Sequence, residues 1–315
     1  MSDLSEKTPK TPQTPQTPEP SDLPKLLVVT GETASGKTAL GVELAKRLDG
    51  EVICADSATV RRGVDIGTAK PTAEERQEVP HHLLDVVEPC GDFTAAVFKR
   101  LANQAIDDIS ARGKLPIMVG GTGLYIDGVI YDFDFMPAGD RQAREELNRL
   151  NPSQLLDRIK RLRLDASGVD VRNKRRLIRL IETKGQKPTR QPLRGNTLLM
   201  GLKTPREEIE QRMIKRLDDM LEAGLEDEVR ALADRYDWDC EALKGIGYAQ
   251  WKDYFQGDQS LPETRSKIIR ATFEYAKRQR TWFKRNKSIH WFHTPVNVEE
   301  VVDYATTFLN GQVPS

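Results

Sequence analysis

The chain has 315 residues, of which 38% are hydrophobic and 30% charged, and its 48 basic side chains balance its 48 acidic ones. This size suits one elaborated α/β domain with a smaller insertion, and the absence of any apolar run near about 18 residues excludes a membrane-spanning chain. Three widely separated cysteines, Cys54, Cys90 and Cys240, offer neither zinc-site spacing nor a disulfide framework, which predicts a reducing, cytoplasmic environment.

The first 22 residues alternate Thr-Pro with polar residues. Proline at that density removes backbone donors and leaves little apolar surface to bury, so we expect an extended, disordered tail. The alternative is a docking segment for a partner that reads proline-rich sequences.

The next stretch has the order strand, glycine-rich loop, helix. Residues 25–30 (KLLVVT) form an apolar, β-branched run that predicts a buried parallel strand. The loop that follows fits G-x-x-x-x-G-K-[ST], the pattern of a phosphate-binding loop. Its residues are Gly31, Glu32, Thr33, Ala34, Ser35, Gly36, Lys37 and Thr38. Loop amides, the start of the helix and Lys37 would converge on a phosphate, and the Thr38 hydroxyl is a candidate ligand for Mg²⁺.

A βα alternation continues to about residue 131. Predicted strands cover residues 51–55 and 115–119, with a loop entering a further strand at 80–86 between them, and predicted helices begin near residues 72, 93 and 124. Asp56 and Ser57 directly follow the first of these strands, at the sheet edge where open α/β folds keep their ligands. The third strand ends in Gly120-Gly121-Thr122-Gly123, which repeats the strand–glycine–helix order.

After Asp132 the alternation stops and helical patterns dominate. We expect helices at 140–164 and 169–184, a strand at 197–202, a long helix from Ser260 to about Arg285, a strand at 289–292 and a helix at 298–309. Thr204, Pro205 and Glu207 predict a capped helix start. The sequence therefore predicts a P-loop NTPase-like, doubly wound parallel sheet from residues 23–131 and 197–315, with a helical insertion at 132–196.

Basic residues gather in two blocks of this neutral chain. Residues 158–194 contain thirteen Lys and Arg but three acidic residues, and the helix within 265–287 is basic with Tyr275, Trp282 and Phe283 interleaved. Although a single basic run is often a solvated helix face, two blocks in a phosphate-binding protein favour a nucleic-acid partner.

The strand ends also bear on the chemistry. NTP-driven motors usually carry an acidic residue after an apolar strand to hold Mg²⁺ and water, whereas the strand at 115–119 ends in Gly-Gly-Thr. Asp56 is better placed to face the phosphate loop, where its carboxylate could accept a proton from a nucleophile.

Several motifs together resemble the bacterial type of the tRNA dimethylallyltransferase (tRNA isopentenyltransferase) family. They run in order from about residue 26 to 292: the phosphate loop, Asp56-Ser57, DIGTAKP at 65–71, PHHLLD at 80–85, GGTGLY at 120–125, IGY at 246–248 and AKRQ-x-TW at 276–282. DIGTAKP and the KRQ-x-TW block are far more specific than the phosphate loop alone.

The resemblance implies transfer of a dimethylallyl group from dimethylallyl diphosphate to N6 of the adenosine immediately 3′ of the tRNA anticodon. By analogy, residues 31–38 grip the diphosphate, not ATP, with Mg²⁺ near Thr38. Asp56 takes the proton from the exocyclic amine of the adenosine, and Thr122 contacts the substrate beside the reaction centre. Arg212 or Arg216 stabilises the leaving diphosphate. The implied tRNA contacts are Asp56, Ser57, Ala58, Thr59, Thr122, Arg144, Arg175, Arg176, Leu177, Ile178, Arg179, Gly247 and Tyr248.

Some positions depart from the family pattern. Glu32 stands where proline is usual, Thr59 where a base-reading glutamine is usual, and Arg61 where tyrosine is usual. Ala249 and Leu180 also differ, and the zinc-finger extension of eukaryotic members is absent. A shorter side chain at position 59 could alter RNA recognition.

Three other functions remain open from the residues alone. They are a small-molecule kinase that uses Asp56 as its base, a prenyltransferase acting on free adenine nucleotides, and a nucleotide-dependent RNA-binding factor. The partners we expect are the tRNA anticodon stem-loop and dimethylallyl diphosphate, with no membrane partner and a monomeric chain.

Overall fold

The computed structural model describes residues 23–136, 139–186 and 188–314. A six-stranded, fully parallel sheet runs in the order β3-β2-β4-β1-β5-β6. The strands are β1 (Leu26–Gly31), β2 (Gly50–Ala55), β3 (His81–His82), β4 (Leu115–Gly120), β5 (Thr197–Lys203) and β6 (Ile289–His293). The predicted tail, residues 1–22, lies outside the described residues.

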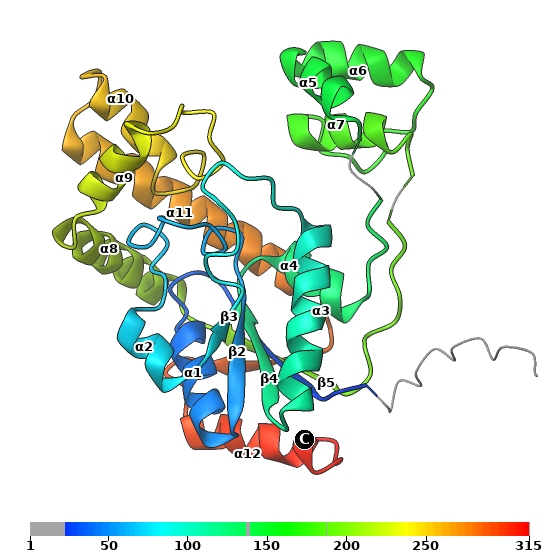
Figure 1. The fold of residues 1–315 in the computed structure, drawn as a ribbon, viewed down its shortest axis with the longest axis vertical. Coiled ribbons are helices and arrows are strands. Elements are labelled where there is room, and N and C mark those ends of the chain that lie inside the picture. Colours follow the sequence, from blue (N-terminus) through cyan, green and yellow to red (C-terminus); the bar gives the residue numbers. More distant parts are fainter. Residues whose placement is uncertain (1–22, 137–138, 187, 315) are drawn as a thin grey trace, which may run out of the picture.

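Helices cover both faces of the sheet, which confirms the predicted α/β fold (Figure 1). Alternate residues of each strand face opposite sides. Leu26 and Val28 pack with α3 (Ala95–Ala111) and α4 (Gly123–Ile130), whereas Leu27 and Val29 pack with α1 (Lys37–Arg47) and α12 (Val298–Leu309). This two-sided burial explains why the strands read as continuous apolar runs.

A second helical core lies beyond the sheet edge. It contains α8 (Arg206–Glu222), α9 (Leu225–Ala233), α10 (Lys252–Phe255) and α11 (Leu261–Phe283), with buried Trp251 and Tyr248 between them. The long α11 then returns to the sheet, where Phe283 joins the first core. Short α2 (Ala73–Glu78) lies between β2 and β3 in the chain.

Helices α5 (Arg141–Arg149), α6 (Pro152–Arg161) and α7 (Lys174–Glu182) share a small apolar core of their own. Figure 1 shows them apart from the sheet, joined to it by two extended segments, and these segments meet in an antiparallel bridge between Asp134 and Thr189. No helix among the residues that the structure describes is long and apolar enough to cross a membrane.

Three expectations from the sequence are wrong. The single helix expected at 140–164 is two helices, because Asn151 caps α6 in a capping box and Pro152 occupies its first turn. Thr204 does not cap α8: Pro205 is extended (φ −53°, ψ 145°) and becomes the N-cap, which leaves Thr204 buried one residue earlier.

The third correction concerns the cysteines. Cys90 and Cys240 form a disulfide across a sequence separation of 150 residues. Spacing in the sequence could not reveal this pair, because the fold alone brings the two loops together. Cys54 is a buried free thiol.

Candidate active site

The phosphate loop connects β1 to α1. Gly36 precedes the helix with φ +90°, a left-handed conformation that favours glycine, and its backbone opens the first turn of α1. Ser35 is buried, and its hydroxyl has no hydrogen-bond partner within the described ranges. A buried hydroxyl without a partner is costly, so this loop is prepared for a ligand oxygen.

Lys37 is the half-buried cation of this loop. Its Nζ donates to the Glu32 carbonyl at 3.2 Å. Burial lowers the pKa of Lys37 to about 8, the charge of Asp56 opposes that shift, and Arg216 adds to it. An anion bound in the loop would favour the charged form of the lysine.

Asp56 and Thr122 meet because β2 and β4 are neighbours whose last residues, Ala55 and Gly120, are in register. The Thr122 hydroxyl accepts a hydrogen bond from the Ser57 amide at 3.0 Å. Asp56 Oδ1 accepts from the amide of Ala58 at 2.8 Å, which fixes the orientation of the carboxylate.

A cavity of about 520 Å³ opens in front of these strand ends, within the size range of small-molecule sites. The phosphate loop, the end of β2, α8, α11 and the loop before Tyr248 contribute to its wall. The predicted site residues that line it are Thr33, Ala34, Asp56, Ser57, Ala58, Arg175, Arg216, Gly247 and Tyr248.

The two candidate arginines of α8 occupy different positions. Arg216 lines the cavity, donates to the Thr68 carbonyl at 3.3 Å and has its pKa lowered by burial. Arg212 donates to the Ala34 carbonyl at 3.2 Å and pairs with Glu208. Arg216 therefore faces the interior of the site, whereas Arg212 braces the phosphate loop from outside the cavity lining.

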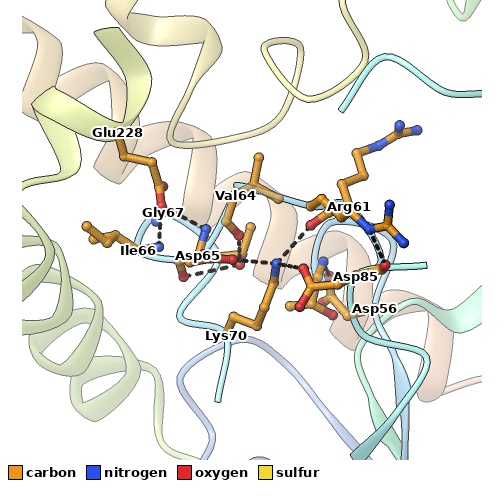
Figure 2. Close-up of polar contacts among 12 residues, drawn as sticks. Asp56, Arg61, Val64, Asp65, Ile66, Gly67, Lys70, Asp85 and Glu228 are labelled. Carbon is orange, nitrogen blue, oxygen red and sulfur yellow. Dashed lines mark hydrogen bonds and ion pairs between the residues drawn. The ribbon is translucent and has the colours of Figure 1, made fainter. Parts of the chain in front are cut away.

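The DIGTAKP loop forms one wall of the cavity and is held from two sides (Figure 2). Lys70 Nζ donates to the Arg61 carbonyl at 2.8 Å and to the carboxylates of Asp65 and Asp85. On the other side, the Glu228 carboxylate accepts hydrogen bonds from the backbone amides of residues 65, 66 and 67 at 2.8–3.0 Å.

Glu228 also holds Tyr248, another residue that lines the cavity. Its carboxylate accepts a hydrogen bond from the Tyr248 hydroxyl at 2.6 Å. Gly67 lies so close to this ring that a Cβ there would come within 2.6 Å of it. One carboxylate thus sets the spacing between the DIGTAKP loop and the IGY motif.

The insertion residues divide into an exposed and a buried set. Arg175 and Arg176 are exposed on α7, and Arg175 reaches Glu241 of the core at 3.3 Å. Arg144 and Arg179 both pair with the carboxylate of Glu182.

Leu177 and Ile178 are buried in the apolar core of the insertion, so their side chains support α7 and do not reach its surface. Thr59 is also buried, and its hydroxyl has no partner in the described part of the chain.

Two side chains that line the cavity, Arg61 and Tyr275, were not predicted to be site residues. Arg61 donates from Nη1 to the carbonyls of Pro89 and Gly91 at 2.9 and 2.8 Å. Tyr275 hydrogen-bonds to Thr122 and Gln279, and burial raises its pKa. The KRQ-x-TW motif is the signal that could have found Tyr275, since it lies just before that motif on the same helix.

For Mg²⁺, the described residues contain no group of three or more His, Cys, Asp and Glu side chains that could hold a metal ion. Magnesium bound through one or two protein oxygens and substrate phosphates needs no such group. The exposed Thr38 hydroxyl and the unpartnered Ser35 hydroxyl fit that mode of binding.

Comparison with known proteins gives a consistent result. A family model described as IPP transferase matches residues 59–286. A tRNA dimethylallyltransferase of Geobacillus thermodenitrificans is 42% identical over 301 residues, covering 89% of this chain and 96% of the relative. The tRNA dimethylallyltransferase 1 of Pelobacter propionicus is 40% identical over 304 residues, covering 91% of this chain and 98% of the relative.

Solved structures agree with these relatives. The tRNA isopentenylpyrophosphate transferase of Bacillus halodurans superposes with a TM-score of 0.72 at 39% identity, covering 91% of this chain and 97% of that one. A eukaryotic dimethylallyltransferase acting on tRNA has a TM-score of 0.77 at 24% identity, covering 93% and 81%, and so shares the fold.

Proposed function

Because this chain belongs to the IPP transferase family, we propose that it transfers a dimethylallyl group from dimethylallyl diphosphate to N6 of the adenosine immediately 3′ of the tRNA anticodon. The observation that carries the proposal is the cavity at the carboxyl ends of the strands. There Asp56, the phosphate loop and Arg216 border one space. A base, an anion site and a buried cation are the groups that this substitution needs.

In the proposed step, the N6 amine attacks the first carbon of the dimethylallyl group as the bond from that carbon to the diphosphate oxygen breaks. The proton released from N6 passes to the Asp56 carboxylate. The departing diphosphate gains negative charge, which the loop amides, Lys37 and Arg216 compensate. Stabilisation of charge that develops during the reaction is the most effective use of such fixed groups.

Magnesium would be held by Thr38 together with the diphosphate oxygens, and when bound it supplies further neutralisation of the leaving group. We assign the remaining work to the chain itself. Arg216 orients the diphosphate and Thr122 holds the Ser57 amide beside the reaction centre. The walls made by Tyr248 and Tyr275 exclude water from the allylic carbon.

A tRNA acceptor is favoured over a free nucleotide by one feature of the cavity. Arg175, on helix α7 of the insertion, lines the same cavity as Asp56. A free nucleotide would not need a cation from a separate helical unit, whereas an anticodon stem-loop would extend from the cavity onto that unit. The adenosine would leave its stack to reach the carboxylate.

The test is an incubation with dimethylallyl diphosphate and either unmodified tRNA or AMP, and separately with ATP and a small acceptor. We expect diphosphate release that depends on tRNA, together with an N6-prenylated adenosine in the digested RNA. Transfer to AMP alone would support a prenyltransferase of free nucleotides, and ADP formation from ATP would support a kinase. Either result would contradict the proposal.

Replacing the proposed base gives the first variant. Asp56→Asn should lower kcat by about 10²–10⁴-fold, because proton acceptance is lost, while the Kd for tRNA stays near that of the wild type. Asp49→Asn is the matched control, since Asp49 is exposed just before β2, whereas Asp56 directly follows that strand. Loss of tRNA binding in the Asp56 variant would refute the assigned role.

A further inference from the structure

A buried carboxylate belongs to the phosphate loop. Glu32, the second residue of the phosphate loop, is only 5% exposed. Arg280 of α11 binds it through two parallel hydrogen bonds, Nε to Oε1 and Nη2 to Oε2, both at 2.9 Å. Burial raises the pKa of Glu32, and the hydrogen bonds and charge of Arg280 oppose that shift.

The residue before Arg280 ties the same helix to the same loop. Gln279 is buried, and its Oε1 accepts the Thr33 amide at 2.8 Å. Its Nε2 donates to the Gly121 carbonyl at 2.9 Å, next to Thr122. Helix α11 therefore contacts two consecutive residues of the phosphate loop, 32 and 33, and the glycine turn after β4.

A carboxylate is an unfavourable neighbour for a diphosphate. In a site of low dielectric constant, like charges repel strongly, and a buried anion without a partner cannot be screened by water. The paired guanidinium cancels this charge. Lys37 also approaches Glu32, but through the backbone carbonyl, so its ammonium remains directed to the loop interior.

We propose that Arg280 is a positioning residue that acts through Glu32. Its guanidinium neutralises the buried carboxylate and keeps the phosphate loop receptive to the diphosphate, without contacting the diphosphate itself. The inference rests on the proposed function, because the allylic diphosphate is the ligand whose binding the pair controls. It assigns a role to the variable position of the KRQ-x-TW motif.

The test is a cycle of three variants in the full chain: Arg280→Gln, Glu32→Gln and the double variant. The KM for dimethylallyl diphosphate and kcat are measured at saturating tRNA. Arg280→Gln should raise KM by about tenfold or more with kcat changed less, because an unpaired carboxylate then remains in the loop that binds the diphosphate. Glu32→Gln and the double variant should each stay within about threefold of wild type, since neither carries that charge.

Binding of inorganic diphosphate, measured by calorimetry, gives a second readout that needs no prenyl transfer. The Kd should rise in Arg280→Gln and stay near that of the wild type in Glu32→Gln and in the double variant. Diphosphate binding therefore distinguishes failure of the proposed function from failure of the role given to Arg280. If tRNA is not prenylated but Arg280→Gln alone weakens diphosphate binding, the proposed function fails and the role of Arg280 stands.

Two controls complete the design. Arg47→Gln removes an arginine that pairs with Glu43 and Glu299 on α1 and α12, and should change neither constant. Arg280→Lys keeps the positive charge beside Glu32, so it should bind diphosphate better than Arg280→Gln. A raised KM that persists in the double variant would show direct contact between Arg280 and the diphosphate and would overturn the proposal, as would an unchanged KM in Arg280→Gln.

Discussion

Lys70 shows how a single buried charge can hold a functional loop. Its ammonium is 1% exposed and bonds to two carboxylates and a backbone carbonyl that lie on both sides of the DIGTAKP turn. Because all its partners belong to loops, the lysine replaces the regular hydrogen bonding that a strand or helix would provide. Lys70 therefore holds one side of the cavity wall formed by residues 64–68, and Glu228 holds the other.

Lys70→Met should lower the free energy of unfolding by about 1–3 kcal/mol, because Asp65, Asp85 and the Arg61 carbonyl lose a charged donor. Urea unfolding followed by circular dichroism measures the change. Lys215→Met, which removes the exposed pair with Asp219, should change the free energy of unfolding much less than Lys70→Met. Equal losses in the two variants would mean that Lys70 has no special structural role.

Residues near strand ends were predictable, and residues on helix faces were less so. Asp56 and Thr122 follow strands whose ends must meet at one edge of a parallel sheet, so their proximity follows from sequence order. The expectation that Leu177 and Ile178 face RNA ignored helical periodicity: with Leu180 and Ile181 they form the apolar side of α7. The Glu32–Arg280 pair spans 248 residues, and no local pattern joins its two members.

At the scale of elements, Glu51 joins three of them. It lies in β2, and its Oε2 meets His82 of β3 and Arg112 at the end of α3, both at 2.6 Å. Burial alone would raise the pKa of Glu51, but these two hydrogen bonds outweigh it and lower the pKa below its ordinary value of 4.5. A carboxyl with a depressed pKa in the folded state stabilises the fold only while it is ionised.

Glu51→Gln should therefore lower the free energy of unfolding by about 1–3 kcal/mol at pH 7. The sign of its pH dependence follows from the depressed pKa: the difference from wild type is full above pH 4.5 and shrinks as the pH falls through the folded-state value. Denaturant titrations between about pH 3 and pH 7 test this. The exposed Glu299→Gln should show little change at any pH, and a difference that grew in acid would refute the assignment.

The bounds of β1, β2, β4, β5 and β6 could be read from the sequence to within a residue, because buried parallel strands are short apolar runs. The segment at 80–86 contains only the two-residue strand β3. The predicted start of α11 at Ser260 is confirmed, and Ser260 and Glu263 form a capping box there. The break between α5 and α6 was missed although Pro152 marks it, since the apolar period continues across the break. Helices α9 and α10 were not predicted: α10 has only four residues, and the core that both helices share draws on positions as far apart as Val64 and Ile268.

At the scale of the whole molecule, the cavity lies where separately packed cores meet. The sheet supplies Asp56, the second helical core supplies Arg216 and Tyr248, and the insertion supplies Arg175. The disulfide joins the loop at Cys90 to the loop at Cys240, next to Glu241, which receives Arg175. These residues lie far apart in the sequence, so only the folded structure shows that they line one cavity.

The exposed arginines of α7 lead to the last prediction. If they bind RNA phosphates, the variant Arg175→Ala/Arg176→Ala should bind tRNA more weakly, and the slope of log K against log salt should become shallower by about 0.7–0.9 for each phosphate that is no longer neutralised. Arg175 already pairs with Glu241 and is 73% exposed, so tRNA must displace that carboxylate before a phosphate can bind the guanidinium. We therefore expect Arg176→Ala alone to cost more affinity than Arg175→Ala alone.

Fluorescence titrations of labelled tRNA at several salt concentrations measure both quantities. The control is Lys46→Ala/Arg47→Ala, which removes two cations from the end of α1, where they pair with Glu78 and Glu299. That variant carries the same change in net charge, so it should leave the salt slope unaltered if binding depends on where the cations lie. Equal shifts in both variants would mean that tRNA responds only to overall charge, and the insertion would then have no specific part in binding.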